Sequence, residues 1–237
     1  MNKLPFSDIE LYSSIYDFID SNMYLLISNN EAVIIDPHKN VQATELLKRN
    51  KIRKVVIMLT HEHPDHISGI WWYIENFDCQ IICTEKCANK LADKRHTRPV
   101  LLNFILEADD IKNGTTRLKD FQKDYVWTTY TADVTFEDTF HFEWNNFSFV
   151  YKAIQGHSLG SCFIILNNKY VFTGDSLLKE YPIIVSFPQG NKDIYVNETI
   201  PIFEKMLKPE MQILPGHGTS FLLQEIMKEG KIYVELR

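Results

Sequence analysis

Residues 60–66 read Thr60-His61-Glu62-His63-Pro64-Asp65-His66, and this stretch decides the fold of the chain. It gathers three imidazoles and the carboxylate of Asp65 directly after an apolar, strand-like run at residues 54–59. Neutral imidazole nitrogen and carboxylate oxygen are ligands that suit zinc, iron or manganese. No helix or sheet needs such side chains crowded at the end of an apolar strand, so the stretch predicts a metal site.

The spacing within this stretch suits two metal ions better than one. His61 and His63 stand at positions i and i+2, so in extended backbone their side chains point to the same side and can bind one ion. Pro64 presets the first turn of a helix, so Asp65 and His66 project from that helix N-terminus in a different direction. The second pair is therefore placed to serve a second ion.

Further polar motifs stand at the ends of apolar runs. Asp36 ends the run Ala32 to Ile35, and the others are Gly156-His157-Ser158, Thr173-Gly174-Asp175-Ser176 and Pro215-Gly216-His217-Gly218. Glycine beside a histidine lets the backbone approach an ion closely. In this order, the motifs resemble those of the metallo-β-lactamase-fold hydrolases. The Thr-Gly-Asp sequence is most similar to the hydroxyacylglutathione hydrolase (glyoxalase II) type.

The resemblance implies two divalent metal ions, with zinc preferred and iron or manganese as alternatives. The first ion would be bound by His61, His63 and His157, and the second by Asp65, His66 and His217. Asp175 would bridge both ions, and Asp36 would orient the metal loop by hydrogen bonding. Residues expected to contact substrate follow the bridging aspartate and are Ser176, Lys179 and Tyr181.

The activity implied by this resemblance is hydrolysis of a small-molecule ester or thioester by a metal-bridging hydroxide, with Asp65 or Asp175 orienting its proton. A phosphodiesterase acting on a nucleotide or other phosphoester is the alternative enzyme. A degenerate metal-binding interaction subunit ranks last, because every ligand is present. True β-lactamases of this fold lack a bridging aspartate. Only residues 218–237 follow His217, so we do not expect the basic helical region that serves glutathione in glyoxalase II, and a glutathione substrate loses its main support.

Composition limits the partners. The 237 residues are 45% hydrophobic and 24% charged, which fits a single globular domain. A formal charge of -6 disfavours nucleic acid, which attracts basic surfaces, and leaves a small molecule as the expected partner. No signal peptide or membrane span is visible, so we expect a cytoplasmic protein without membrane contact. The cysteines, namely Cys79, Cys83, Cys87 and Cys162, are expected to be reduced and at least half-buried.

The order of apolar runs predicts an α/β (α+β) fold, and the resemblance implies a four-layered αββα sandwich. The predicted strands are 24–27, 32–35, 54–59, 80–84, 139–144, 147–154, 162–166, 169–172 and 211–214. The predicted helices are 41–51, 64–77, 193–207 and 220–229. The ligands would then lie on loops at one edge of the sandwich. His38, His96 and His141 fall outside the motifs, and His38 is expected to be an exposed loop residue.

The segment from Glu85 to Val134 departs from a minimal fold of this type. It inserts helical, aromatic-rich sequence between the two halves of the single domain. Long insertions beside an active site serve as lids, binding loops or dimer surfaces. We therefore expect either a lid over the metal cleft or the interface of a homodimer. Its aromatic residues are equally well suited to forming a small core of their own.

Overall fold

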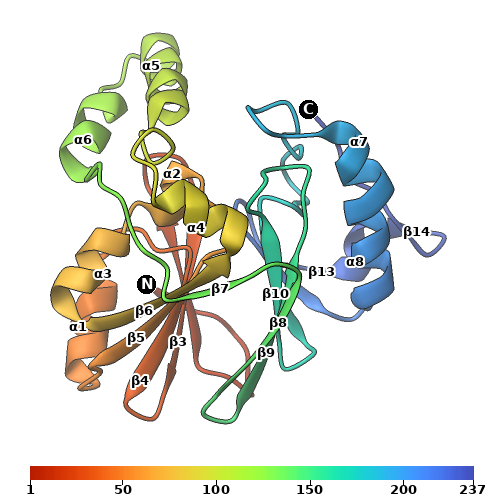
Figure 1. Ribbon diagram of the computed structural model, residues 1–237, viewed down its shortest axis with the longest axis horizontal. Helices are drawn as coiled ribbons and strands as arrows, with labels where there is room; N and C mark the ends of the chain where they lie inside the picture. The colour runs from red at the N-terminus through yellow and green to blue at the C-terminus, as the bar shows by residue number, and fades with distance from the viewer.

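The computed structural model describes all residues from Met1 to Arg237. Two sheets pack face to face, and helices cover the outer face of each sheet (Figure 1). The sheets contain seven and six strands, and a small two-stranded ribbon lies near the C-terminus. This arrangement confirms the predicted αββα sandwich.

The first sheet joins an antiparallel N-terminal part to a parallel part. Its strands are, in spatial order, β1 (Asn2–Lys3), β2 (Leu11–Tyr16), β3 (Ser21–Ser28), β4 (Glu31–Ile35), β5 (Lys54–Met58), β6 (Asp78–Thr84) and β7 (Val134–Phe136). From β4 to β7 the strands pair in parallel. Their connections include the helices α1 (Val41–Arg49), α2 (Pro64–Ile67), α3 (Ile70–Asn76) and α4 (Glu85–Leu91). Parallel strands covered on both faces require the nearly continuous apolar runs seen here.

The second sheet is mostly antiparallel. Its strands are β8 (Thr139–Trp144), β9 (Phe147–Ala153), β10 (Cys162–Leu166), β11 (Tyr170–Gly174), β12 (Gln212–Pro215) and β13 (Phe221–Leu222). The β8–β9 and β10–β11 hairpins turn at asparagines, with left-handed φ values of 52° at Asn145 and 51° at Asn167 and Asn168. The covering helical segment consists of α7 (Lys192–Ile194), a π-helical turn (Tyr195–Thr199) and α8 (Ile200–Met206).

The main core lies between the two sheets. It contains 18 buried residues, among them Tyr24, Ile35, Phe149, Tyr151 and Phe172. A second cluster of 18 lies between the first sheet and its helices, and one of 12 lies between the second sheet and its helices. Because apolar side chains anchor both faces of each sheet, the loops at the sheet ends are free to carry polar residues.

Two helix predictions need correction. The predicted helix 64–77 is divided into α2 and α3, because the Gly69 N–H leaves the helix ladder and donates to the Pro37 carbonyl at 2.8 Å. The backbone of His38 packs so closely there that an added Cβ on Gly69 would lie 2.3 Å from its carbonyl carbon. The predicted helix 220–229 is wrong: the chain forms β13, a 3-10 turn (Leu223–Ile226) and β14 (Met227–Lys228), which pairs with β15 (Lys231–Ile232). Glu229 and Gly230 take positive φ values of 49° and 78° there, which a helix does not allow.

The insert contains α4, α5 (Val100–Asn113) and α6 (Arg117–Asp124). Leu102, Leu106 and Phe121 pack with Tyr16 of β2 in a separate small cluster, so the insert shares this small core with the end of β2. In Figure 1, α5 and α6 lie at the same end of the molecule as α2. Whether the insert is a lid or a dimer interface stays a prediction.

Two composition-based expectations bear on this architecture. All four cysteines are free, three of them are buried and Cys79 is half-buried, as predicted. None of the helices combines the length and the apolar composition needed to cross a bilayer.

Candidate metal centre

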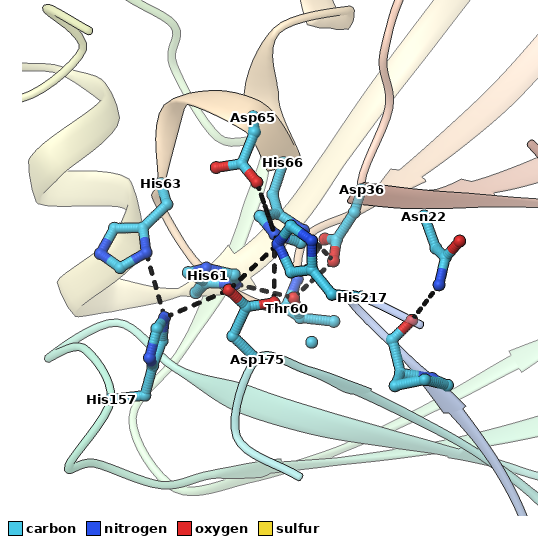
Figure 2. A network of polar contacts seen from close by, with 12 residues as sticks. Asn22, Asp36, Thr60, His61, His63, Asp65, His66, His157, Asp175 and His217 are labelled. Atoms are coloured by element: carbon cyan, nitrogen blue, oxygen red, sulfur yellow. Dashed lines mark hydrogen bonds and ion pairs between the residues drawn. The ribbon is translucent and has the colours of Figure 1, made fainter. Parts of the chain in front are cut away.

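The polar motifs meet at one end of the sandwich, where loops leave the strands of both sheets. His61 and His63 follow β5, and Pro64 begins α2 at its N-terminus, as the sequence predicts. His157 follows β9, Asp175 follows β11 and His217 follows β12. Figure 2 shows these side chains converging from the two sheets. The structure therefore brings together every residue that the sequence assigned to a metal site.

Three groups of side chains have metal-ligand spacing, and one of them, made of Asp36, His61 and His66, links the other two. Those two are called the clusters below. One cluster contains His61, His63, His157 and Asp175, and the other contains Asp65, His66 and His217. Within each cluster, one potential ligand atom of every residue lies within 4.8 Å of those of the others. His61 and His63 belong to one cluster, as expected for positions i and i+2 in extended backbone.

Asp175 lies between the two clusters. Its Oδ2 atom is 3.7 Å from His157 Nε2 and 3.4 Å from His217 Nε2. Its Oδ1 atom is 3.3 Å from His66 Nε2. One carboxylate thus approaches histidines of both clusters, which is the position a bridging ligand requires.

Asp36 holds the 60–66 stretch through its carboxylate. Its Oδ1 atom accepts the backbone N–H of Thr60 at 2.8 Å, and its Oδ2 atom accepts the Thr60 hydroxyl at 2.5 Å. Oδ2 also lies 3.0 Å from His66 Nδ1, which leaves Nε2 of that ring for an ion. The backbone of Asp36 has a left-handed φ of 52°, a costly conformation that accumulates at functional sites.

The backbone carbonyl of Ile184 orients His157. Its Nδ1 atom lies 2.8 Å from the carbonyl oxygen of Ile184, which fixes that nitrogen as the N–H donor. Nε2 is then unprotonated and faces His63 Nδ1 at 3.1 Å. Two imidazole nitrogens directed at one point are arranged as ligands of a shared ion.

The buried atoms of the centre fit a cation. His61 Nε2, His66 Nε2 and Asp175 Oδ1 are buried and have no hydrogen-bond partner. His66 Nε2 is 3.2 Å from Asp65 Oδ2, close enough for an ion pair but without hydrogen-bond geometry. Buried polar atoms without partners are rare and costly, whereas atoms that point at a common ion need no hydrogen bond.

The proton affinities of the centre fit the same assignment. Burial lowers the pKa of His63 to about 3, and it also lowers the pKa of His61 well below its usual value. Burial alone would lower the pKa of His217, but the carboxylates of Asp175 and Asp65 raise it to about 10. The same carboxylates raise the pKa of His66 well above its usual value. The carboxylates of Asp65 and Asp175 thus make a positive charge favourable at this place in the site.

The 175–191 loop, which joins β11 to α7, holds the residues predicted to contact substrate. Ser176 is 2% exposed, and Lys179 Nζ lies 2.6 Å from Glu225 Oε2, so neither faces the centre freely. The Tyr181 ring lies 6.4 Å from the ring of His217. The sequence analysis missed Phe187, whose ring is 5.9 Å from His63 and 6.4 Å from His157.

Tyr195 of the π-helical turn joins two ligand loops. Its hydroxyl donates to the Ser176 carbonyl at 2.7 Å, next to Asp175. Its ring packs on Gly156, next to His157, where an added Cβ would lie 2.5 Å from Tyr195 Cβ. Gly156 also has a φ of 113°, which other residues rarely adopt. The glycine of the Gly-His-Ser motif therefore serves close packing against Tyr195.

His38 is not the exposed residue that the sequence suggested. It is 2% exposed, its Nε2 atom lies 3.0 Å from Ser14 Oγ, and its ring stacks on Tyr16 at 5.2 Å. Burial lowers its pKa to about 3. It packs beside Tyr16 of β2 and does not belong to the ligand clusters.

Known proteins similar to this chain include metallo-hydrolases. A probable metallo-hydrolase of Streptococcus pyogenes is 27% identical over 90% of this chain and 85% of its own length. The hydroxyacylglutathione hydrolase of Bdellovibrio bacteriovorus is 28% identical, but the match covers 41% of this chain and 37% of that enzyme. The crystal structure of the BLEG-1 B3 metallo-beta-lactamase superposes with a TM-score of 0.69 at 21% identity, covering 90% of this chain and 93% of that chain.

The family profile spans both halves of the site. It matches residues 16–217, from the end of β2 to the last histidine of the two clusters. Together with the named hydrolase relatives and the paired ligand clusters, this match identifies a metal-dependent hydrolase. The chain belongs to the Metallo-beta-lactamase superfamily.

Proposed function

We propose that the protein is a dinuclear metal hydrolase that cleaves small-molecule esters or thioesters. The position of Asp175, within 3.7 Å of His157 in one cluster and within 3.4 Å of His217 in the other, carries this proposal. The ligands of one ion would be His61, His63 and His157, and those of the other Asp65, His66 and His217. Asp175 would contact both. Imidazole and carboxylate ligands suit zinc, with iron and manganese as alternatives.

The residues of the chain would then divide the work of hydrolysis. Bound divalent ions lower the pKa of a water towards neutrality and polarise a carbonyl oxygen. Nearby histidines hold the pKa of the Asp65 and Asp175 carboxyls well below the usual value, against the effect of burial. Both therefore stay ionised and can orient an attacking water by accepting a hydrogen bond from it. The fixed histidines keep this geometry without reorganisation during the reaction.

Local charge favours a carbonyl substrate over a phosphodiester. Glu180 bonds Thr219, two residues beyond His217, and so adds an anionic side chain beside the second cluster. The nearby cation Lys179 is paired with Glu225. The chain as a whole carries a formal charge of -6. Glu180 would repel a substrate that carries an anionic phosphate, and Lys179 is already engaged by Glu225.

A substrate panel on metal-reconstituted protein tests the proposal. We expect kcat/KM on p-nitrophenyl acyl esters, thioesters or lactones to exceed that on bis(p-nitrophenyl) phosphate, with two metal ions bound per chain. A phosphodiester preference of roughly a hundredfold, worth about 2.7 kcal/mol in transition-state stabilisation, would reverse the assignment. Binding of two ions without turnover of any substrate would favour a binding subunit instead.

A further inference from the structure

Two aromatic rings stand at opposite ends of the candidate metal centre. Phe187 lies against His63 and His157 of the first cluster, with rings inclined by 73° and 62°. Tyr181 lies against His217 of the second cluster, inclined by 72°. Both rings come from the 175–191 loop, although the histidines that they contact come from three different loops. One loop therefore supplies an aromatic side chain beside each of the two clusters.

Neither ring is needed to pack the protein. Leu178, Ile183 and Val185 of the same loop are buried in a cluster with Tyr195, and they anchor the loop. Phe187 and Tyr181 belong to none of the five apolar clusters. Tyr181 is 47% exposed, and Phe187 is half-buried. Aromatic side chains left out of the core beside a reactive centre are positioned to contact a ligand.

The loop that carries the rings is held firmly. The Ile183 N–H donates to the backbone carbonyl of Glu235 at 2.7 Å, and the Val185 N–H donates to that of Arg237 at 2.8 Å. These bonds join the loop to the C-terminal segment. Beyond Phe187, the Gln189 side chain accepts a hydrogen bond from Lys90 of α4. The Ile184 carbonyl bonds His157 in the same stretch. The loop backbone that carries the two rings is therefore held relative to the ligand histidines, as a selective pocket requires.

We propose that Phe187 and Tyr181 form the walls of the substrate pocket and select acyl compounds whose acyl group is a hydrocarbon chain or ring. This inference rests on the proposed acyl hydrolysis and names its substrate class. A hydrocarbon group between the two rings would be removed from water at both ends of the centre. Each buried methylene then adds to binding by the hydrophobic effect, and a short acyl group would leave the walls uncovered.

Binding of two hydroxamates tests the pocket without requiring turnover. Acetohydroxamate and octanohydroxamate carry the same metal-binding head, and they differ only in the hydrocarbon chain. On metal-loaded wild-type protein, calorimetry should show octanohydroxamate binding at least about tenfold more tightly, since burying two of its additional methylenes suffices. Equal affinities, or failure of both compounds to bind, would overturn the inference.

Substitutions assign the preference to the two rings. Phe187→Ala and Tyr181→Ala should each reduce the ratio of the two affinities by about threefold to tenfold, while bound metal and acetohydroxamate affinity stay close to wild type. Phe187→Leu should restore most of the preference, because it returns an apolar side chain. Tyr233→Ala, at a tyrosine that is 52% exposed on the C-terminal ribbon, is the matched control and should leave the ratio unchanged. A full preference in both alanine variants would overturn the assignment.

The same data separate this inference from the proposed function. If the wild-type protein prefers octanohydroxamate but hydrolyses no ester, thioester or lactone, the acyl pocket stands and the proposed reaction falls. If esters are hydrolysed with kcat/KM independent of acyl length and the two hydroxamates bind equally, the reaction stands and the pocket is wrong.

Discussion

The two halves of the candidate metal centre are built in different ways. In the first half, His61, His63, Asp65 and His66 lie in one continuous stretch that runs from the end of β5 into α2. In the second half, three residues stand on separate loops after β9, β11 and β12. Local backbone geometry places the first set, whereas contacts between distant segments must place the second. Ligands of one site can therefore be placed by one short sequence or by many tertiary contacts.

The supporting contacts differ accordingly. One residue, Asp36, holds Thr60 and His66 of the first half. In the second half, His157 depends on the Ile184 carbonyl, and the loops before His157 and after Asp175 meet at Tyr195. The loop around His217 is held by Asn22 and Tyr24 of β3, from the other sheet. Each of these contacts gives a substitution that probes one half separately.

The largest effect is expected where the halves meet. Asp175→Asn keeps the shape of the side chain but removes the negative charge between His66 and His217. Activity should fall by well over a hundredfold, beyond the roughly 10- to 100-fold loss typical of residues that only orient ligands. Metal analysis should show fewer than two ions per chain. The control is Asp138→Asn, at an exposed aspartate paired with Lys152. An equal loss of activity in the control would show that Asp175 has no specific role in the centre.

Asp36→Asn probes the first half. Asparagine tolerates the left-handed backbone of this position, so the change isolates the loss of one acceptor oxygen. The remaining amide cannot accept from both Thr60 and His66, and its NH2 group would face a donor. We expect metal affinity or kcat/KM to fall by about 10- to 100-fold. Chelator competition measures the affinity, and unchanged metal binding would show that the first half needs no support beyond its own sequence.

Much of this first half was predictable from sequence, for a physical reason. The ligands of residues 61–66 are fixed by strand periodicity and by Pro64, both of which are local. The apolar runs that became β5 and β10 were equally clear, because buried strands need continuous hydrophobic sequence. The His157, Asp175 and His217 motifs were recognised by resemblance, but nothing in their sequence showed which residues hold them.

The features that sequence reasoning missed depend on contacts between distant residues. The helix is interrupted at Gly69, whose N–H bonds the distant Pro37 carbonyl, and neither residue indicates this alone. Phe187 looks like any loop aromatic until the fold brings it beside His63. Strand β7 pairs with β6 across the whole insert, and three residues carry too weak a pattern to be recognised. The predicted helix 220–229 failed because a turn at Glu229 and Gly230 redirects apolar residues into short strands.

Asn22→Ala probes the His217 loop. The Asn22 amide donates to Pro215 at 3.0 Å and to Gly218 at 2.8 Å, so the variant loses two hydrogen bonds across the sheets. The Pro215 carbonyl keeps its hydrogen bond from the Tyr24 hydroxyl, so only the Gly218 carbonyl is left without a partner. That loss should cost about 1–3 kcal/mol, which thermal unfolding should reveal. We expect one of the two ions to bind more weakly while the other is retained, because His61, His63 and His157 are untouched. Equal weakening of both ions would mean that the two clusters do not respond separately.

Tyr195→Phe should give the smallest effect, and it is the sharpest test of the comparison. Only the hydroxyl that donates to Ser176 is removed, while the ring remains to pack on Gly156. The lost bond should cost about 1–3 kcal/mol of stability, since the Ser176 carbonyl stays buried.

If Tyr195 also positions Asp175, the affinity for metal should fall severalfold and kcat should fall more than KM rises, with the fold intact. Tyr170→Phe, which removes a hydroxyl bonded to Asp8 away from the centre, is the matched control. A stability loss in Tyr195→Phe without any change in metal affinity would show that the second half is positioned by its backbone alone. The contrast between the halves would then lie in their sequence spacing and not in how their ligands are held.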